Sequence, residues 1–266
     1  MARRVAVVTG ASRGAGLGIS AALSQAGWRV YATGRSIADA PPGGVALRVD
    51  HGDDDAVAAL FGRVATDEGR LDLLVNNAAA VHDELTGGQP FWTKPLDLAD
   101  VLDVGLRSAY VASWYAAPLL VARDRGMIAF TSSPGSVCYM HGPAYGAQKA
   151  GIDKMAADMA VDFRGTGVAT VSIWMGILLT EKLRRAFDGH PDALARTAEH
   201  AETPEFTGRL IDALFADPDL PALSGQTLIA AELAHRYGIT DEGGRTPPSH
   251  RDALGAPRLP SDVVVR

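Results

Sequence analysis

The sequence contains a single cysteine, Cys138, among its 266 residues, so no disulfide can form within the chain and nothing points to an oxidising compartment. No run approaches the roughly 20 apolar residues that a membrane span needs, and the short apolar stretch near the start ends at Thr9-Gly10, too early for a signal peptide. The seven histidines lack the spacing of a metal site. We therefore expect a soluble, cytoplasmic protein without a membrane or metal partner.

An excess of positive charge is also missing, because 25 Lys and Arg face 31 Asp and Glu, for a net charge of −6. Nucleic-acid binding needs a basic face, so we expect no nucleic-acid partner. The 47% hydrophobic and 21% charged residues match ordinary globular proteins. We expect one domain over residues 1–266, with residues 243–266, rich in Pro, Gly and Arg, forming a tail on the surface or against a neighbouring subunit.

Short apolar runs alternate with longer helical patterns along the chain, which is typical of an α/β protein with a parallel sheet. Strands are expected at Val5–Val8, Val30–Ala32, Val45–Val49, Leu71–Val75, Met127–Phe130, Val168–Trp174 and Thr227–Ile229. Helices are expected at Leu17–Ala26, Asp54–Glu68, Leu98–Ala122, Tyr145–Phe163 and Phe206–Phe215. The prediction is a doubly wound parallel sheet of about seven strands with helices on both faces, which binds ligands beyond the carboxyl ends of its strands.

A glycine-rich turn follows the first expected strand and opens a helix, which is the context of a dinucleotide-binding site. Glycines allow a tight turn and a close approach to a pyrophosphate, while the helix N-terminus attracts the anion. A turn that merely joins strand to helix is the alternative. The candidate cofactor-binding residues here are Gly10, Ser12, Arg13, Gly14, Ala15 and Gly16.

A basic residue stands where NAD-selective sites place an acid, because Arg35 follows the second expected strand. A guanidinium pairs bidentately with phosphate and keeps its proton, and Arg13 lies in the preceding loop. We therefore expect NADP(H) to be preferred over NAD(H), unless both arginines are simply solvated surface charges.

Polar residues also end the third and fourth expected strands. Asp50 could accept a hydrogen bond from an adenine amino group, and Asn76, followed by Asn77 and Ala78, could hold the turn against the cofactor's ribose. Each has an alternative role as a turn residue at the end of a strand, because Asp and Asn favour such positions.

A possible reactive group combines Ser132 and Ser133 at the end of the fifth strand with Tyr145 and Lys149 in the following helix. Residues four apart lie on one helical face. A nearby ammonium favours the phenolate, so we expect Lys149 to lower the pKa of Tyr145 towards neutrality. A serine hydroxyl opposite the phenol could bind the substrate's carbonyl or alcohol oxygen.

Taken in this order, the motifs TGASRGAG, NNAA and YxxxK with Ser133 resemble the short-chain dehydrogenase/reductase family over residues 4–235. The resemblance implies an NAD(P)-binding Rossmann fold, a homodimer or homotetramer, and hydride transfer between C4 of the nicotinamide and a carbonyl carbon. It also implies that Tyr145 is the acid/base, that Lys149 holds the ribose and that Ser133 orients the substrate.

Three features depart from the family pattern. Gly105 stands where the family usually has an asparagine that supports a proton-relay water, so the relay must differ or be weaker. Met175-Gly176 replaces the usual Pro-Gly, after which Ile177 is expected to contact the carboxamide and Thr180 a phosphate. The interval before Tyr145 is one residue short, which leaves Ser132 as an alternative to Ser133.

A second resemblance, to the member 1-like branch of this family, rests on Phe91-Trp92, Ser132–Ser136, Tyr139-Met140 and Ala234–Gly238. That branch looks like carbonyl reductases of steroids and xenobiotic ketones. The hydrophobic C-terminal extension of that branch's animal members is missing, so we expect no membrane association. Trp114 and Trp174 are expected to be core residues. The expected substrate is a hydrophobic carbonyl or alcohol, in a cleft lined by Phe91, Trp92, Tyr139, Met140, His141, Met175 and Leu178.

Two alternatives to the reductase remain. A dinucleotide-binding sensor or scaffold with weak catalysis would fit the loss of the asparagine at Gly105. An epimerase or dehydratase on the same fold would use the cofactor without its net oxidation.

Overall fold

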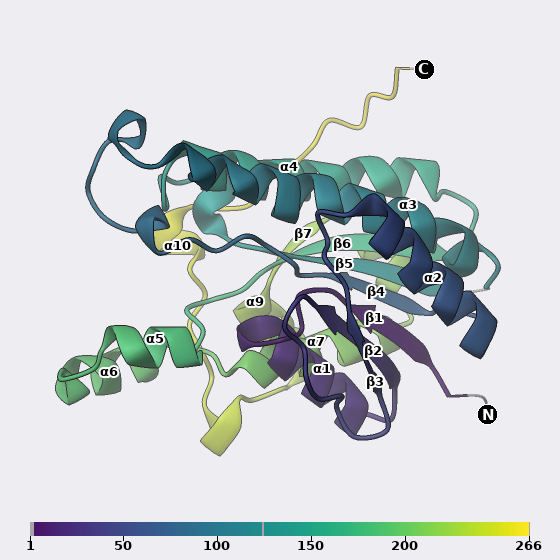
Figure 1. Cartoon of the computed structure of the whole chain (residues 1–266), viewed down its shortest axis with the longest axis horizontal. Helices are drawn as coiled ribbons and strands as arrows, with labels where there is room; N and C mark the ends of the chain where they lie inside the picture. The colour runs from purple at the N-terminus through teal and green to yellow at the C-terminus, as the bar shows by residue number, and fades with distance from the viewer. Residues whose placement is uncertain (1–2, 124, 266) are drawn as a thin grey trace.

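The computed structural model describes residues 3–123 and 125–265. Within these residues one sheet has the strand order β3-β2-β1-β4-β5-β6-β7, and all neighbouring strands are parallel (Figure 1). The predicted doubly wound α/β architecture is confirmed. The strands are β1 (Val5–Val8), β2 (Arg29–Gly34), β3 (Val45–Arg48), β4 (Leu73–Asn76), β5 (Gly126–Ser132), β6 (Val168–Trp174) and β7 (Thr227–Ile229).

The central strands are apolar throughout because both faces of the sheet are covered. All four residues of β1 are buried, and Val7 is paired with Tyr31 of β2 on one side and Leu74 of β4 on the other. The order in which strands are added to the sheet reverses at β1. The chain first adds β2 and β3 on one side of β1, and then β4 to β7 on the other side. Such a switch point leaves a crevice at the carboxyl ends, where ligands bind in open α/β sheets.

Helices cover the sheet in two layers (Figure 1). One layer packs against a core that contains Ile19, Leu210 and Leu233, and the other against a core that contains Phe61, Ala112 and Ile152. The first layer comprises α1 (Gly14–Gln25), α7 (Pro204–Ala216) and α9 (Ala230–Tyr237), and the second α2 (Asp54–Glu68), α3 (Ser108–Val121) and α4 (Pro143–Asp162).

Five short helices were not predicted, among them α9 of the first layer. The pair α5 (Glu181–Ala186) and α6 (Pro191–Ala198) forms an arm that projects from the carboxyl edge of the sheet (Figure 1). None of their residues is buried, so neither helix contributes to the two cores of the domain. The others are α8 (Leu220–Leu223) and α10 (Arg251–Leu254).

The prediction of one continuous helix over Leu98–Ala122 was wrong. A short turn covers Leu96–Ala99, a widened turn covers Leu102–Arg107, and α3 begins only at Ser108. The break lies at Gly105, whose φ of 152° is in the region that favours glycine. Its backbone N–H donates to the Ser108 side chain at 3.0 Å, which supports the start of α3.

The loop that precedes this break leaves its aromatic residues exposed. Phe91 is 60% exposed and Trp92 74% exposed, and their rings pack edge to face against each other in a short turn over Phe91–Thr93. Trp114 on α3 was wrongly expected in the core, since it is 59% exposed. Trp174 is buried as predicted.

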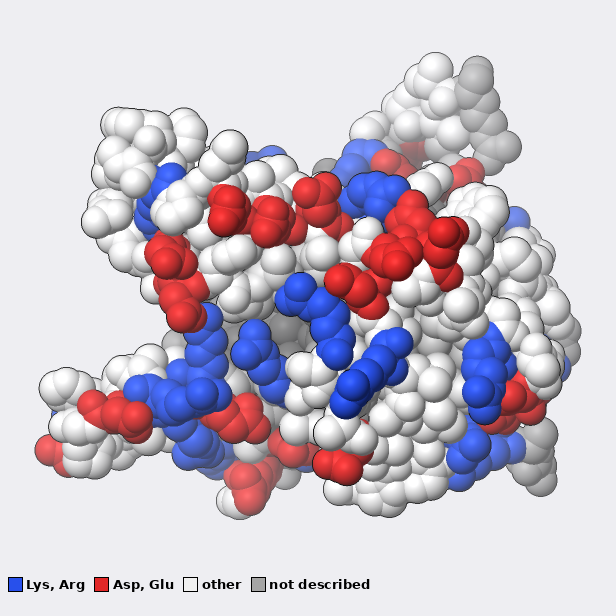
Figure 2. Space-filling model, viewed as in Figure 1, with Lys and Arg blue, Asp and Glu red and all other residues white. Residues whose placement is uncertain are grey.

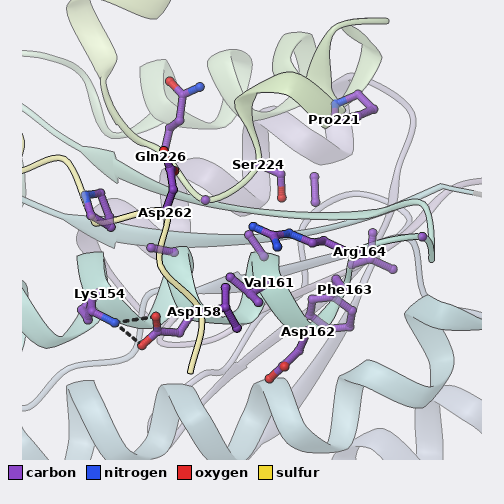
Figure 3. A pocket seen from close by; sticks show the side chains of 18 of the residues that line it. Lys154, Asp158, Val161, Asp162, Phe163, Arg164, Pro221, Ser224, Gln226 and Asp262 are labelled. Atoms are coloured by element: carbon purple, nitrogen blue, oxygen red, sulfur yellow. Dashed lines mark hydrogen bonds and ion pairs between the residues drawn. The ribbon is translucent and has the colours of Figure 1, made fainter. Parts of the chain in front are cut away.

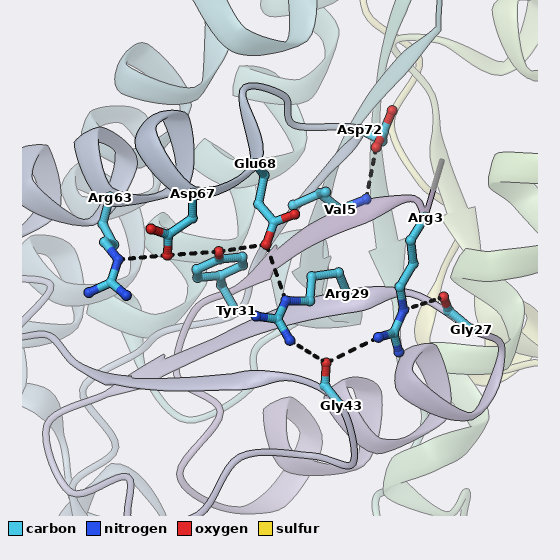
Figure 4. Close-up of polar contacts among 10 residues, drawn as sticks. All are labelled: Arg3, Val5, Gly27, Arg29, Tyr31, Gly43, Arg63, Asp67, Glu68 and Asp72. Atoms are coloured by element: carbon cyan, nitrogen blue, oxygen red, sulfur yellow. Dashed lines mark hydrogen bonds and ion pairs between the residues drawn. The ribbon is translucent and has the colours of Figure 1, made fainter. Parts of the chain in front are cut away.

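Polar contacts connect β1 and β2 to the end of α2 and to the residue before β4 (Figure 4). The Tyr31 hydroxyl donates to Glu68 at the end of α2 at 2.8 Å, and burial beside this carboxylate raises the pKa of Tyr31. Arg29 bonds to the same Glu68, and Asp72 accepts the Val5 backbone N–H at 2.8 Å. These contacts join β2 to the end of α2 and β1 to the residue before β4, away from the crevice.

A cavity of about 1330 Å³ lies between α4 and the C-terminal segment (Figure 3). Its lining includes Arg125, Lys154, Gln226 and Asp262, and it borders the amino ends of β5, β6 and β7. It is therefore at the opposite end of the sheet from the crevice. No helix in the described ranges combines the length and apolar composition required of a bilayer-spanning segment.

Candidate active site

The glycine-rich turn has the geometry of an anion-binding site. Gly10 and Gly14 have φ of 67° and 56°, and a Cβ on Gly16 would overlap the Gly10 carbonyl oxygen and the Asn77 side chain. Helix α1 has neither a side-chain cap nor an acidic residue in its first turn. Its first N–H groups therefore remain available to an anion, which fits the pyrophosphate of a dinucleotide.

The predicted contact residue Asn77 supports this turn from behind. Its amide nitrogen donates to the carbonyl oxygens of Thr9 at 3.0 Å and Gly10 at 3.1 Å. In return, the Thr9 hydroxyl accepts the backbone N–H groups of Asn77 at 2.9 Å and Ala78 at 3.0 Å. The ends of β1 and β4 are thus joined, and the side chain of Asn77 holds the phosphate turn in shape.

Basic side chains border a hollow at the carboxyl end of the sheet, near the centre of the face in Figure 2. Arg13 and Arg35 are exposed, and neither forms an ion pair within residues 3–123 and 125–265. Between them, a Cβ on Gly34 would overlap the Ser12 hydroxyl. The turn therefore lies directly against the end of β2, with both guanidinium groups facing solvent.

Of the two polar residues that follow β3, Asp50 is exposed and His51 is buried. Asp50 is exposed, and one of its carboxylate oxygens accepts the Gly52 backbone N–H at 2.9 Å. His51 is buried and lies 2.8 Å from the Thr33 hydroxyl, and burial lowers its pKa to about 4. Asp50 therefore keeps an oxygen for a ligand, while neutral His51 holds the ends of β2 and β3 together.

Ser133 and Tyr145 meet at the end of β5. The Ser133 hydroxyl lies 3.0 Å from the Tyr145 hydroxyl and accepts the Gly135 backbone N–H at 3.2 Å. The alternative, Ser132, is fully buried, and its hydroxyl has no partner among the described residues. The short interval before Tyr145 is thus accommodated with Ser133 beside the phenol.

Lys149 lies beneath Tyr145 on the same face of α4. Its ammonium donates to the Thr131 carbonyl oxygen at 3.2 Å and lies 5.4 Å from the centre of the Tyr145 ring. Burial lowers the pKa of Lys149 to about 8, against the opposing effect of Asp153. Burial also raises the pKa of Tyr145, with the Ser133 hydrogen bond opposing it. The expected lowering of the phenol pKa is therefore wrong for the chain alone.

The loop after β6 connects the two halves of the crevice. It starts where the Met175 N–H donates to the Ser132 carbonyl oxygen at 3.2 Å. It ends at Thr180, whose hydroxyl caps α5 and whose methyl carbon lies 3.5 Å from the position of a Cβ on Gly14. Ile177, between these ends, is 47% exposed. The predicted contacts Ile177 and Thr180 therefore lie on a segment that spans from the Ser133–Tyr145 pair to the phosphate turn.

Sequence reasoning missed Gln148, which fills the space beside Gly105. The Gln148 amide nitrogen donates to the Gly105 carbonyl oxygen at 3.2 Å, and a Cβ on Gly105 would lie 3.3 Å from this side chain. Gln148 is 2% exposed. Its position next to Lys149 was visible in the sequence, but its partner across the fold was not.

His141, one of the residues predicted to line the substrate cleft, lies beside Tyr145. It has a φ of 57°, unusual for a residue with a side chain, and its ring packs edge to face on Tyr145 with centroids 5.0 Å apart. Burial, followed by the charge of Lys94, lowers the pKa of His141. A neutral imidazole thus forms one wall beside the phenol.

A family model described as short chain dehydrogenase matches residues 4–190. The chain belongs to this family. It is 41% identical over 263 residues to human "Dehydrogenase/reductase SDR family member 1", covering 91% of this chain and 84% of the relative. The mouse protein of the same name is 40% identical, covering 92% and 85%. The predicted likeness to the member 1-like branch is confirmed, as is an NAD(P)-dependent oxidoreductase of this family.

Solved structures agree on the fold. A crystal structure described as ribose-5-phosphate isomerase from Brucella melitensis 16M superposes with a TM-score of 0.74 at 27% identity, covering 86% of this chain and 91% of that one. A putative short-chain alcohol dehydrogenase from Sinorhizobium meliloti 1021 gives 0.71 at 24% identity, covering 86% and 95%. The arrangement of the sheet and its helices is therefore shared with solved structures over 86% of this chain.

Proposed function

We propose that this oxidoreductase uses NADPH to transfer a hydride between the nicotinamide and a carbonyl or secondary alcohol of a hydrophobic substrate. One observation carries the proposal: the Ser133 and Tyr145 hydroxyls lie 3.0 Å apart at the carboxyl edge of the sheet, above the buried ammonium of Lys149. Two hydroxyls at this spacing can both bond to one substrate oxygen.

The proton is handled by this chain's own residues. Burial keeps the Tyr145 phenol protonated, and a protonated phenol can donate to the oxygen of a carbonyl as it is reduced. Ser133 holds that oxygen in place. Lys149, with a pKa of about 8, can return a proton towards the phenol near neutral pH. The cofactor, when bound, supplies the hydride.

The preference for NADPH rests on the charges at the adenine end. Arg13 and Arg35 are exposed on either side of the Ser12–Gly34 contact, and no acid stands at the end of β2 to bind ribose hydroxyls. A 2′-phosphate placed there would receive bidentate contacts from a guanidinium.

A hydrophobic substrate would suit the rim of the crevice. Phe91, Trp92 and Tyr139 are 60%, 74% and 82% exposed. The Met140 sulfur lies 4.0 Å from the Ser133 hydroxyl. Apolar walls around a few convergent polar groups are the usual composition of a small-molecule site.

We also propose a homodimer or homotetramer that covers α3. Tyr110, Trp114 and Val121 are 54%, 59% and 44% exposed and share one face of this helix by their spacing. A helix that is apolar on its outer face as well as its inner one is normally buried by a further partner, here a second copy of the chain.

The reaction is tested by following NADPH oxidation with a panel of bulky ketones, using wild type and Tyr145→Phe. We expect turnover to fall by at least about 10²-fold in Tyr145→Phe, with NADPH affinity changed less than threefold. Binding of NADPH without turnover that depends on Tyr145 would refute the reductase and favour the sensor suggested by the break at Gly105. Product formed without net cofactor oxidation would favour an epimerase or dehydratase.

A further inference from the structure

A buried carboxyl group that takes no part in the proposed proton transfer lies behind the loop between β6 and α5. Glu202 is 1% exposed, and one of its carboxyl oxygens is buried without a hydrogen-bond partner among the described residues. A buried acid is costly unless it is paired or protonated. No cation neutralises it, since Glu202 appears in no ion pair within the described ranges.

Glu202 is attached to the loop along its length. Its backbone N–H donates to the Ile177 carbonyl oxygen at 2.7 Å, and its own carbonyl oxygen accepts the Leu179 N–H at 2.9 Å. The Gly176 backbone N–H faces the Glu202 carboxyl closely enough to oppose part of the rise in its pKa. Three successive contacts thus fix the segment that joins the Ser133–Tyr145 pair to the phosphate turn.

The Glu202 carboxyl and an imidazole from the C-terminal segment both lie against Gly176. A Cβ on Gly176 would lie 2.7 Å from a Glu202 carboxyl oxygen and 2.7 Å from the His250 Nε2 atom. Only glycine therefore fits between the two groups. His250 is partly buried, and burial lowers its pKa, so the imidazole does not supply a fixed positive charge.

Asp241 is the other charged residue that acts on Glu202, and it has two arginine partners of its own. This residue is buried, accepts the Thr203 backbone N–H at 2.7 Å, and pairs with Arg209 and Arg245 at 2.7 and 3.0 Å. Its negative charge disfavours ionisation of Glu202, as does burial, and together they raise the pKa of Glu202 to about 7. The proton of Glu202 is therefore exchangeable near neutral pH.

We propose that Glu202 is a positioning residue that, through Gly176 and beside His250, holds the loop over the nicotinamide half of the site and favours the oxidised, positively charged ring when its carboxyl is ionised. The inference deepens the proposed function and rests on dinucleotide binding in the crevice. Its physical basis is that an ionised carboxylate in a poorly screened interior attracts a cation and has no such effect on a neutral ring.

The test measures the dissociation constants of NADP⁺ and NADPH by calorimetry at pH 6 and pH 8. Both forms carry the same 2′-phosphate, so the ratio of the two constants cancels the titration of that phosphate. Tyr145 and Lys149 also respond to the ring charge. The readout is therefore the change of this ratio between pH 6 and pH 8, compared between wild type and Glu202→Gln. Glutamine retains the shape of the side chain and cannot ionise. Glu199→Gln, at an exposed carboxylate three residues away, is the matched control.

We expect the preference for NADP⁺ over NADPH to rise between pH 6 and pH 8 by about threefold to tenfold more in wild type and Glu199→Gln than in Glu202→Gln. Equal pH profiles in all three proteins would overturn the inference while leaving the proposed function intact. Failure of wild type to bind either dinucleotide would overturn both. If Glu202→Gln does not fold, His250→Gln replaces it, and an unchanged pH profile in that folded variant overturns the role of the pair.

Discussion

Replacing Glu202 by glutamine should reduce the loss of stability that the protein suffers as the pH rises. The free energy of unfolding of Glu202→Gln should therefore fall less between pH 5 and pH 8 than that of wild type. Burial raises the pKa of Glu202 from 4.5 to about 7. Between these values the folded chain keeps a proton that the unfolded chain releases, so the free energy of unfolding falls as the pH rises. The stability that protonated Glu202 contributes is lost progressively above pH 4.5, and this loss is nearly complete above pH 7 to 8.

The size of this effect follows from the shift. Each pKa unit corresponds to about 1.4 kcal/mol, and integration between pH 5 and pH 8 gives about 2.5 kcal/mol of stability lost by the wild type through this group. Glutamine cannot ionise, so Glu202→Gln should lose about 2.5 kcal/mol less over the same interval. Other titrating groups are common to both proteins and cancel in the comparison.

Urea unfolding at pH 5 and pH 8, followed by circular dichroism, measures the free energy of unfolding for wild type, Glu202→Gln and Glu199→Gln. Glu199 is exposed, so its variant should follow the wild type at both values. If Glu202→Gln and wild type lost stability in parallel, the carboxyl of Glu202 would have an ordinary pKa and the reasoning would be refuted.

Three further changes test other parts of the molecule. Arg35→Ala should weaken NADPH binding about tenfold and leave NADH binding within twofold, measured by fluorescence titration; equal losses for both would contradict a phosphate contact. Gly16→Ala should weaken both cofactors by more than about 100-fold, because its Cβ would overlap the Gly10 carbonyl. Gly62→Ala, which meets nothing within 4 Å, is its control. Trp114→Glu should shift the sedimentation profile towards the monomer, and an unchanged profile would place the interface elsewhere.

The element pattern was the most predictable part of the fold. β1, β6 and β7 have the predicted bounds, and the other strands differ by one or two residues at an end. A strand buried on both faces must be continuously apolar, so this signal is local. The arm formed by α5 and α6 was missed because its helices have only six and eight residues, which is too short for a helical period to stand out in the sequence.

The residue types of the candidate site were also readable, since Gly10 and Gly14 adopt the positive φ that a tight turn requires. The pKa of Tyr145 was not, because it depends on burial, which is a property of the whole fold. The exposure of Trp114 was mispredicted for a related reason: aromatic character favours burial, and a single sequence does not say whether its own fold or a second copy covers the ring.

The sequence by itself determined the seven-stranded sheet, the turn after β1 and the four-residue step from Tyr145 to Lys149, because each depends on neighbours along the chain. Only the tertiary structure decided that Ser133 faces the phenol, that Gln148 fills the space beside Gly105, and that Glu202 lies buried behind Gly176. These are contacts between residues 12 to 43 positions apart, and their geometry is set by how strands and helices pack rather than by any local pattern.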